Sequence, residues 1–432
     1  MSLCTDRKLR MQGLEQRQLM AGDVAAYVQD GTLYVEGDNA DNQVVVNDWH
    51  GGNSTTLQLT GENGTPIDSE FTFFNPEGTG TQEAFDSIVF RMGGGGDKVR
   101  FANTGGTQNF DGHITVDMGA SGGAGDRFEM AGWDVDRGMN VYNSVISADV
   151  SDSNIGGYLG INALSIDIDE VMVGQTDDVT NYGTFLHGAN QIDVNLLTTS
   201  DLSISTHDLQ NSQSETNYVD LRSVNVEGDA HYRGNIAADH LTVNNMFTGG
   251  SFDIKTYSNV SAATEAQSAR DVVELNNLWI EQDLKVDAGS NNRGDIFELS
   301  NSTINRDARL DGGNGGNRMD LENVDVGRDL RMYGGSSRDT MTLKNVDIDD
   351  DLWMYTYAGN DDVTMTDVDA VDNLYANLGS GSDDLTILAG SSAYRLWLVG
   401  GTGKGETDSL TLSSRTSFQT NDVSGFEDIL VK

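Results

Sequence analysis

The chain has 432 residues, of which 68 are Asp or Glu and 26 are Lys or Arg, so its formal net charge is −42. This charge argues against nucleic acid and anionic membrane surfaces as partners, because both would repel the protein. The single cysteine, Cys4, excludes an intramolecular disulfide framework, and no apolar run approaches the length of a membrane span.

Residues 1–24 are basic and are expected to form a short helix that serves in export or as a cap on the fold. They lack the continuous apolar core of a secretory signal. A cap is useful because the end of a solenoid exposes its apolar core and unpaired strand edges. Leu9, Leu14 and Leu19 are suitably spaced to cover such an end.

The stretch LEQRQLMAGDV at 14–24 resembles the Leu-Glu-x-Arg-x-Leu-(Leu/Met)-Ala-Gly motif that opens many large exported proteins of planctomycete bacteria. The segment GTLYVEGDNADNQVVVND at 31–48 resembles the first β-turns of their repeat regions, and VSGFEDILV at 423–431 resembles a common closing strand. The resemblance is confined to these segments. It implies export, and therefore an extracellular or cell-surface location, and it implies nothing about activity.

Apolar residues recur every 22 residues in the C-terminal third of the chain. One such column contains Leu299, Leu321, Leu343, Met365 and Ile387, and two others, offset by two residues, contain Leu330, Leu352, Leu374 and Leu396 and Met332, Met354, Ala376 and Leu398. The offset of two is the alternation of a strand. Glycines keep the same period at Gly313, Gly335, Gly379 and Gly401, with Tyr357 at the intervening position.

These columns predict an all-β fold, a right-handed parallel β-helix with about 22 residues per rung. Residues 25–432 should form a single domain of this kind, with roughly eighteen rungs at about 4.8 Å each. The spacing loosens upstream, since Leu275 and Leu299 are 24 residues apart. The segment SNVSAATEAQSARD at 258–271 is extra to the repeat and is expected to be a side insertion.

Outward positions should stack as strictly as inward ones. The predicted binding surface consists of Arg331, Tyr333, Trp353, Tyr355, Tyr375 and Trp397, which recur along neighbouring outward columns. A flat face of aromatic rings can stack sugar rings or dock another protein. A loop, a terminus or a second copy of the chain could equally cover this face.

Acidic residues also recur at the repeat period. Asp361, Asp362, Asp383 and Asp384 are the candidate metal ligands, because carboxylates on neighbouring rungs repel each other and a calcium ion would relieve this repulsion. The turns at 92–101, 120–130 and 378–388 resemble the Gly-rich, Asp-containing turns of calcium-binding RTX β-rolls, although the nine-residue period of that family is absent. Solvated acidic turns are the alternative. The column of Asn301, Asn323 and Asn345 is expected to form a structural amide ladder.

The uniform repeat favours a non-enzymatic extracellular structural or surface protein. An acidic rod of this kind could self-associate or contact other envelope proteins. The alternative is a polysaccharide-binding or polysaccharide-degrading protein of the lyase or glycosidase kind, since outward carboxylates one rung apart suit glycoside chemistry. Against catalysis, the six histidines show no metal or triad spacing, and no acidic cluster stands out from the columns.

Overall fold

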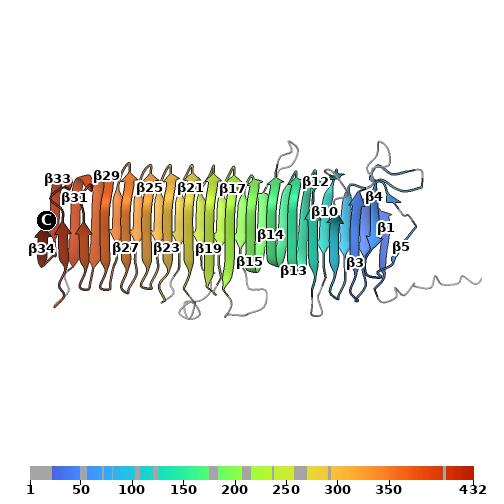
Figure 1. Ribbon diagram of the computed structural model, residues 1–432, viewed down its shortest axis with the longest axis horizontal. Coiled ribbons are helices and arrows are strands. Elements are labelled where there is room, and N and C mark those ends of the chain that lie inside the picture. Colours follow the sequence, from blue (N-terminus) through green and yellow to red (C-terminus); the bar gives the residue numbers. More distant parts are fainter. Residues whose placement is uncertain are drawn as a thin grey trace, which may run out of the picture.

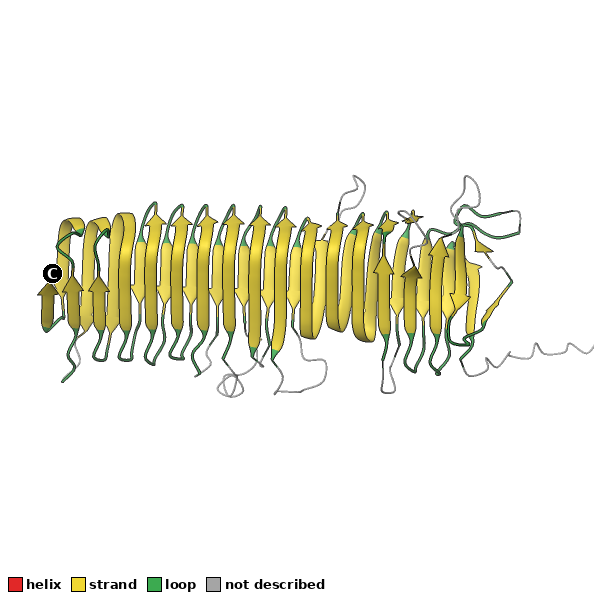
Figure 2. Ribbon diagram, in the orientation of Figure 1, coloured by secondary structure: helices red, strands yellow, loops and turns green. Residues whose placement is uncertain are grey.

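The computed structural model describes residues 22–48, 56–70, 73–79, 81–102, 108–119, 125–174, 183–206, 216–235, 238–256, 270–289, 293–401 and 405–432. Its strands form a single 34-stranded sheet that winds into an elongated solenoid (Figure 1). Strands and the turns and loops between them build this part of the chain, which contains no helix (Figure 2). The solenoid has about 13 turns, about 23 residues apart. The predicted all-β parallel architecture is therefore confirmed, and its right-handedness stays a prediction.

The strands follow one another along the long axis of the molecule. The first group comprises β1 (Val24–Gln29), β2 (Thr32–Glu36), β3 (Gln43–Asp48), β4 (Leu57–Gly61), β5 (Ile67–Ser69), β6 (Phe73–Phe74), β7 (Ser87–Arg91), β8 (Lys98–Ala102), β9 (Gln108–Phe110), β10 (His113–Asp117), β11 (Arg127–Ala131) and β12 (Trp133–Val135). The middle group comprises β13 (Gly138–Ile155), β14 (Tyr158–Val173), β15 (Gly183–Thr199), β16 (Leu202–Ser205), β17 (Asn217–Val226), β18 (Ala230–Arg233), β19 (Asp239–Thr248), β20 (Phe252–Lys255), β21 (Val272–Ile280) and β22 (Leu284–Asp287). The last group comprises β23 (Ile296–Ile304), β24 (Ala308–Asp311), β25 (Arg318–Val326), β26 (Leu330–Tyr333), β27 (Thr340–Ile348), β28 (Leu352–Tyr355), β29 (Asp362–Gly379), β30 (Asp384–Ile387), β31 (Ser392–Gly401), β32 (Ser409–Leu412), β33 (Ser417–Ser424) and β34 (Asp428–Val431).

The N-terminal strands differ from the rest because they pair antiparallel. Strand β1 pairs antiparallel with β2, and β3 pairs antiparallel with β4. On their other edges β2 and β3 pair in parallel with β7 and β8, where the regular stack begins. Val24, Leu57 and Phe74 are fully buried under this arrangement. The antiparallel strands thus cover the first parallel rung. The predicted N-terminal helix cannot be compared, because residues 1–21 lie outside the described part.

Residues separated by one repeat lie side by side in adjacent rungs. Leu321 pairs with Leu299 on one side and with Leu343 on the other, and the column continues to Met365 and Ile387. All five side chains are buried in one continuous core. The predicted repeat and its register are therefore confirmed. The expected eighteen rungs were too many, since the solenoid has about 13 turns. The antiparallel N-terminal strands take up part of the chain, and some upstream rungs are longer, such as the 32 residues from Val243 to Leu275.

An amide ladder stabilises the same bend on three consecutive rungs. Asn301, Asn323 and Asn345 adopt left-handed φ angles of 51°, 57° and 53°, a conformation that Asn tolerates better than most residues. The amide of Asn323 donates to the side-chain oxygen of Asn301 at 2.9 Å, and the amide of Asn345 donates to that of Asn323 at 3.0 Å. The predicted structural role of this column is confirmed. Most of the expected insertion at 258–271 lies outside the described residues, and Asp271 belongs to the regular stack.

Candidate functional site

The predicted aromatic surface forms a continuous strip on one side of the solenoid. Arg331, Trp353, Tyr375 and Trp397 are register partners on consecutive rungs, from β26 through β28 and β29 to β31. Tyr333 and Tyr355 are partners in the next outward column. The structure therefore brings all six predicted surface residues together.

The rings touch one another along this strip. The ring centroids of Tyr333 and Tyr355 are 5.6 Å apart with planes at 4°, an almost parallel stack. Trp353 and Tyr375 are 5.2 Å apart, and Tyr355 and Tyr375 are 5.3 Å apart. Tyr375 and Trp397 meet edge to face at 5.4 Å. We call Tyr333, Trp353, Tyr355, Tyr357, Tyr375 and Trp397 the aromatic ladder.

The aromatic ladder is open to solvent on one side. Most of its rings are half-buried against their neighbours, while Trp397 is 45% exposed and Tyr357 is 55% exposed. Burial, followed by the neighbouring tyrosines, raises the pKa of the Tyr355 hydroxyl above its usual value of 10.0. The hydroxyl therefore stays neutral and can both donate and accept hydrogen bonds at physiological pH.

Tyr357 belongs to the ladder although the sequence did not assign it there. Its ring centroid lies 6.2 Å from that of Tyr355, with planes at 21°. Its φ angle is 65°, in the left-handed region, and the equivalent positions one rung later and two rungs earlier hold Gly379 and Gly313, with φ of 93° and 71°. A tyrosine in this conformation costs about 1–2 kcal/mol relative to a right-handed one. The interrupted glycine column was the sequence signal for this residue, since such strain is often tolerated where a side chain has a function.

The four candidate metal ligands separate into two pairs. Asp361 and Asp383 are buried, at 1% and 0% exposure, whereas Asp362 and Asp384 lie on the outer face of β29 and β30. The buried side chains accept backbone N–H groups, from Asp339 to Asp361 at 2.7 Å and from Asp361 to Asp383 at 2.8 Å. Asp362 pairs with Arg338, and Asp384 accepts a hydrogen bond from the Ser409 hydroxyl.

Asp361 and Asp383 are buried and Asp362 and Asp384 lie on the outer face, so these four carboxylates do not converge on one point. Within the ranges that the structure describes, no group of three or more His, Cys, Asp or Glu side chains is arranged to hold a metal ion. Calcium binding by these residues remains a prediction.

Asp361 and Asp383 are part of a longer row, which we call the buried Asp ladder. Each Oδ1 atom in it accepts the backbone N–H of the corresponding residue one rung earlier. Burial raises the pKa of Asp339 and of Asp383 to about 7. The ladder consists of Asp271, Asp295, Asn317, Asp339, Asp361, Asp383 and Asp408, all at most 2% exposed. Its carboxylates therefore hold the turns together instead of facing solvent.

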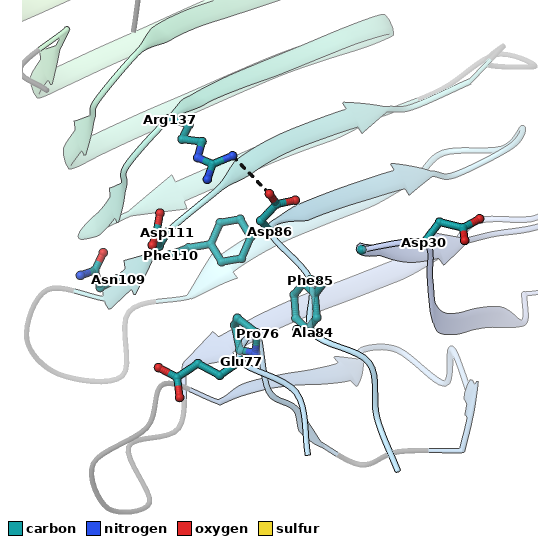
Figure 3. A pocket seen from close by; sticks show the side chains of 11 residues that line it. Asp30, Pro76, Glu77, Ala84, Phe85, Asp86, Asn109, Phe110, Asp111 and Arg137 are labelled. Carbon is teal, nitrogen blue, oxygen red and sulfur yellow. Dashed lines mark hydrogen bonds and ion pairs between the residues drawn. The ribbon is translucent and has the colours of Figure 1, made fainter. Parts of the chain in front are cut away.

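A cleft of about 650 Å³ lies near the N-terminal end of the solenoid. Figure 3 shows Phe110 beside the ion pair between Arg137 and Asp86, whose Nη1 and Oδ2 atoms are 3.2 Å apart. The ring centroid of Phe85 lies 6.3 Å from that of Phe110. Its further lining includes the carboxylates of Asp30, Glu77 and Asp111. An apolar base with a charged rim is a common form of ligand site. Sequence reasoning missed it because most of its residues come from loops without a repeat period.

A second hollow is lined by an acidic column that the sequence analysis also missed. Asp149, Asp167, Asp193 and Asp220 are register partners on four successive rungs and line about 460 Å³. Burial, and then the charge of Asp167, raises the pKa of Asp149 above its usual value. The upstream repeats are irregular in length, and this irregularity hid the column.

The comparisons with known proteins concern the N-terminal segment. Residues 5–24 match the model of a family described as planctomycete extracellular. No curated protein and no solved structure matches the chain. The match confirms the resemblance on the LEQRQLMAGDV segment and the expected extracellular location. Among the described residues, no helix is long and apolar enough to cross a membrane.

Proposed function

We propose that this chain, an extracellular repeat protein, is a non-enzymatic structural rod that holds polysaccharide on its aromatic ladder. The observation that carries the proposal is the contact of successive rings across four rungs, at centroid distances of 5.2 to 5.6 Å. Aromatic faces stack on sugar rings, and the tyrosine hydroxyls can bond sugar hydroxyls. The ladder would thus contact several consecutive sugar units at once.

The remainder of the structure suits a rigid support. The apolar core is continuous from Val24 to Leu410. In the C-terminal part of the solenoid, the amide ladder and the buried Asp ladder tie successive rungs together through side-chain hydrogen bonds. Rings mounted on such a frame lose little conformational freedom when a polymer binds, which favours affinity.

Affinity gel electrophoresis with polysaccharide in the gel tests the proposal. The double variant Trp353→Ala and Trp397→Ala should lose most of the retardation shown by the native protein. Trp279→Ala is the matched control, because Trp279 is 49% exposed but lies in β21, on a different side of the rung. Equal retardation of the native protein and the double variant would remove the ladder from consideration. Release of soluble sugar in the same samples would favour the degrading alternative.

A second role, self-assembly, is favoured by the exposed strands of the last described rung. Strand β34 pairs with β32 and β33 pairs with β31, and each has one edge without a strand partner among the described residues. Ile429, Leu430 and Val431 are 55%, 49% and 63% exposed. Such edges can pair with a further chain. Analytical ultracentrifugation with and without calcium tests this role, and a strict monomer under all conditions would contradict it.

A further inference from the structure

We propose that the polysaccharide is anionic, and that a row of cations on the same side of the solenoid binds its acidic groups. The inference rests on the proposed glycan-binding role of the aromatic ladder and specifies the class of glycan. The cationic row comprises Arg233, Lys255, Lys285, Arg309 and Arg331, one residue on each of the successive strands β18, β20, β22, β24 and β26.

The cationic row occupies the same two outward columns as the aromatic ladder. Lys285 is the register partner of Arg309, Arg309 of Arg331, and Arg331 of Trp353. Arg233 and Lys255 are partners in the other column, which leads through two aspartates to Tyr333. From β18 to β31 the combined strip crosses seven steps, or about 34 Å at about 4.8 Å per step.

The two parts of the strip are in direct contact. The guanidinium carbon of Arg309 lies 4.3 Å from the ring centroid of Tyr333, a cation–π arrangement. A polymer that lies along the ladder would therefore continue onto the cations without leaving the surface.

Two of the five cations are available to a ligand. Arg233, Arg309 and Arg331 pair with Asp253, Asp311 and Asp329, at 3.6, 2.6 and 2.5 Å. Lys255 and Lys285 make no ion pair with any residue that the structure describes. Their ammonium groups can bind a carboxylate or sulfate group as point charges.

The position of these cations is unusual for so acidic a chain. A different outward column, on the side of the rung that also carries Trp279, holds Asp325, Asp347 and Asp369 on consecutive rungs. Because salt screens exposed charges beyond about 8 Å at physiological ionic strength, a polymer on this strip responds mainly to the charges of the strip itself. These are the five cations, set against Asp253, Asp287 and Asp311 in the same two columns and Asp329 beside Arg331. Charge complementarity therefore favours uronate or sulfated sugars over neutral ones.

The experiment compares an anionic and a neutral glycan. Gel retardation is measured with alginate and with hydroxyethyl cellulose, both in EDTA so that calcium cannot bridge carboxylates. The test variant is Lys255→Gln with Lys285→Gln. The charge-matched control is Lys98→Gln with Lys344→Gln, two lysines outside the strip that pair with Glu129 and Glu322.

The native protein should bind alginate more tightly than the neutral glycan. The test variant should bind alginate about tenfold more weakly, as expected for two lost charged contacts, with unchanged binding of the neutral glycan and no effect in the control. The inference would be overturned if the native protein did not bind alginate, or if the test variant bound alginate as tightly as the native protein. In either case, binding of the neutral glycan that depends on the aromatic ladder would still support the proposed function. If neither glycan is retarded, the proposed function fails as well.

Discussion

Replacing Asp383 by Asn should stabilise the solenoid above neutral pH and leave its stability nearly unchanged in acid. The side chain is 0% exposed, and its Oδ1 atom accepts the N–H of Asp361 at 2.8 Å. Its Oδ2 atom is buried without a hydrogen-bond partner among the described residues. Burial raises the pKa of this carboxyl from 3.8 to about 7.

The pH dependence of stability follows from the state, folded or unfolded, in which the Asp383 carboxyl binds its proton more tightly. Since the pKa of Asp383 is higher in the folded state than in the unfolded state, its contribution to stability is fully present below pH 3.8 and is lost as the pH rises through about 7. The pKa rises by about 3 on folding, and each unit corresponds to 1.36 kcal/mol. The contribution of Asp383 to the free energy of unfolding therefore falls by at most about 4 kcal/mol between pH 4 and pH 8. An amide does not ionise and avoids this loss.

An asparagine fits this position. Asn42 and Asn317 occupy the corresponding turn position in other rungs, and each donates its amide to the carbonyl two residues earlier, at 2.7 and 3.0 Å. By analogy with these two residues, we expect the new amide of the Asp383→Asn variant to donate to the carbonyl of Gly381. The retained side-chain oxygen can still accept the N–H of Asp361.

Urea unfolding followed by circular dichroism at pH 4.5 and pH 8 measures the effect. The control is Asp384→Asn, which removes an exposed carboxylate next in sequence and should change stability little at either pH. Equal stability of the native protein and Asp383→Asn at pH 8, or a loss at both pH values, would refute the reasoning.

Three further predictions follow from the same structure. Leu343→Ala should lower the free energy of unfolding by about 2–5 kcal/mol, because this core side chain is 0% exposed; a change under 1 kcal/mol in urea titrations would argue against its place in the core. Tyr357→Gly should leave the melting temperature nearly unchanged, since relief of its left-handed φ offsets the lost ring contact, yet it should weaken glycan retardation; unaltered retardation would remove Tyr357 from the ladder. If Asp362 and Asp384 take part in calcium binding, titration calorimetry on chelator-treated protein should show saturable heat that the double Asn variant lacks; no heat in the native protein would contradict the calcium prediction.

The repeat and the outward columns were predictable because strand alternation and a fixed period place Leu343 inward and Trp353 outward without further knowledge. The orientation of Asp361 and Asp383 was not predictable in this way. They lie in turns, where backbone conformation decides the direction of a side chain. The hydrogen bonds that they accept from the preceding rung become visible only once the rungs are stacked.

The N-terminal cleft was beyond sequence reasoning for a different reason. Strand β2 pairs in parallel with β7 across a step of 55 residues, from Thr32 to Ser87, so Asp30 and Asp86 are brought to the same cleft by a pairing outside the 22-residue period. Likewise, the cationic row is spread over steps of 22, 30, 24 and 22 residues from Arg233 to Arg331. Only the register of β18 to β26 aligns it with the aromatic ladder.

Stacking in register is the central claim, and one distance tests it most directly. Thr242 and Thr411 lie in the same outward column, linked by seven consecutive register pairs. Spin labels on cysteines at these two positions, with Cys4 replaced by Ser, should give a single electron–electron distance of about 34 Å. This distance corresponds to seven rungs of about 4.8 Å each. A broad distribution, or a distance that differs by more than the reach of the label linkers, would show that these rungs do not stack in this order.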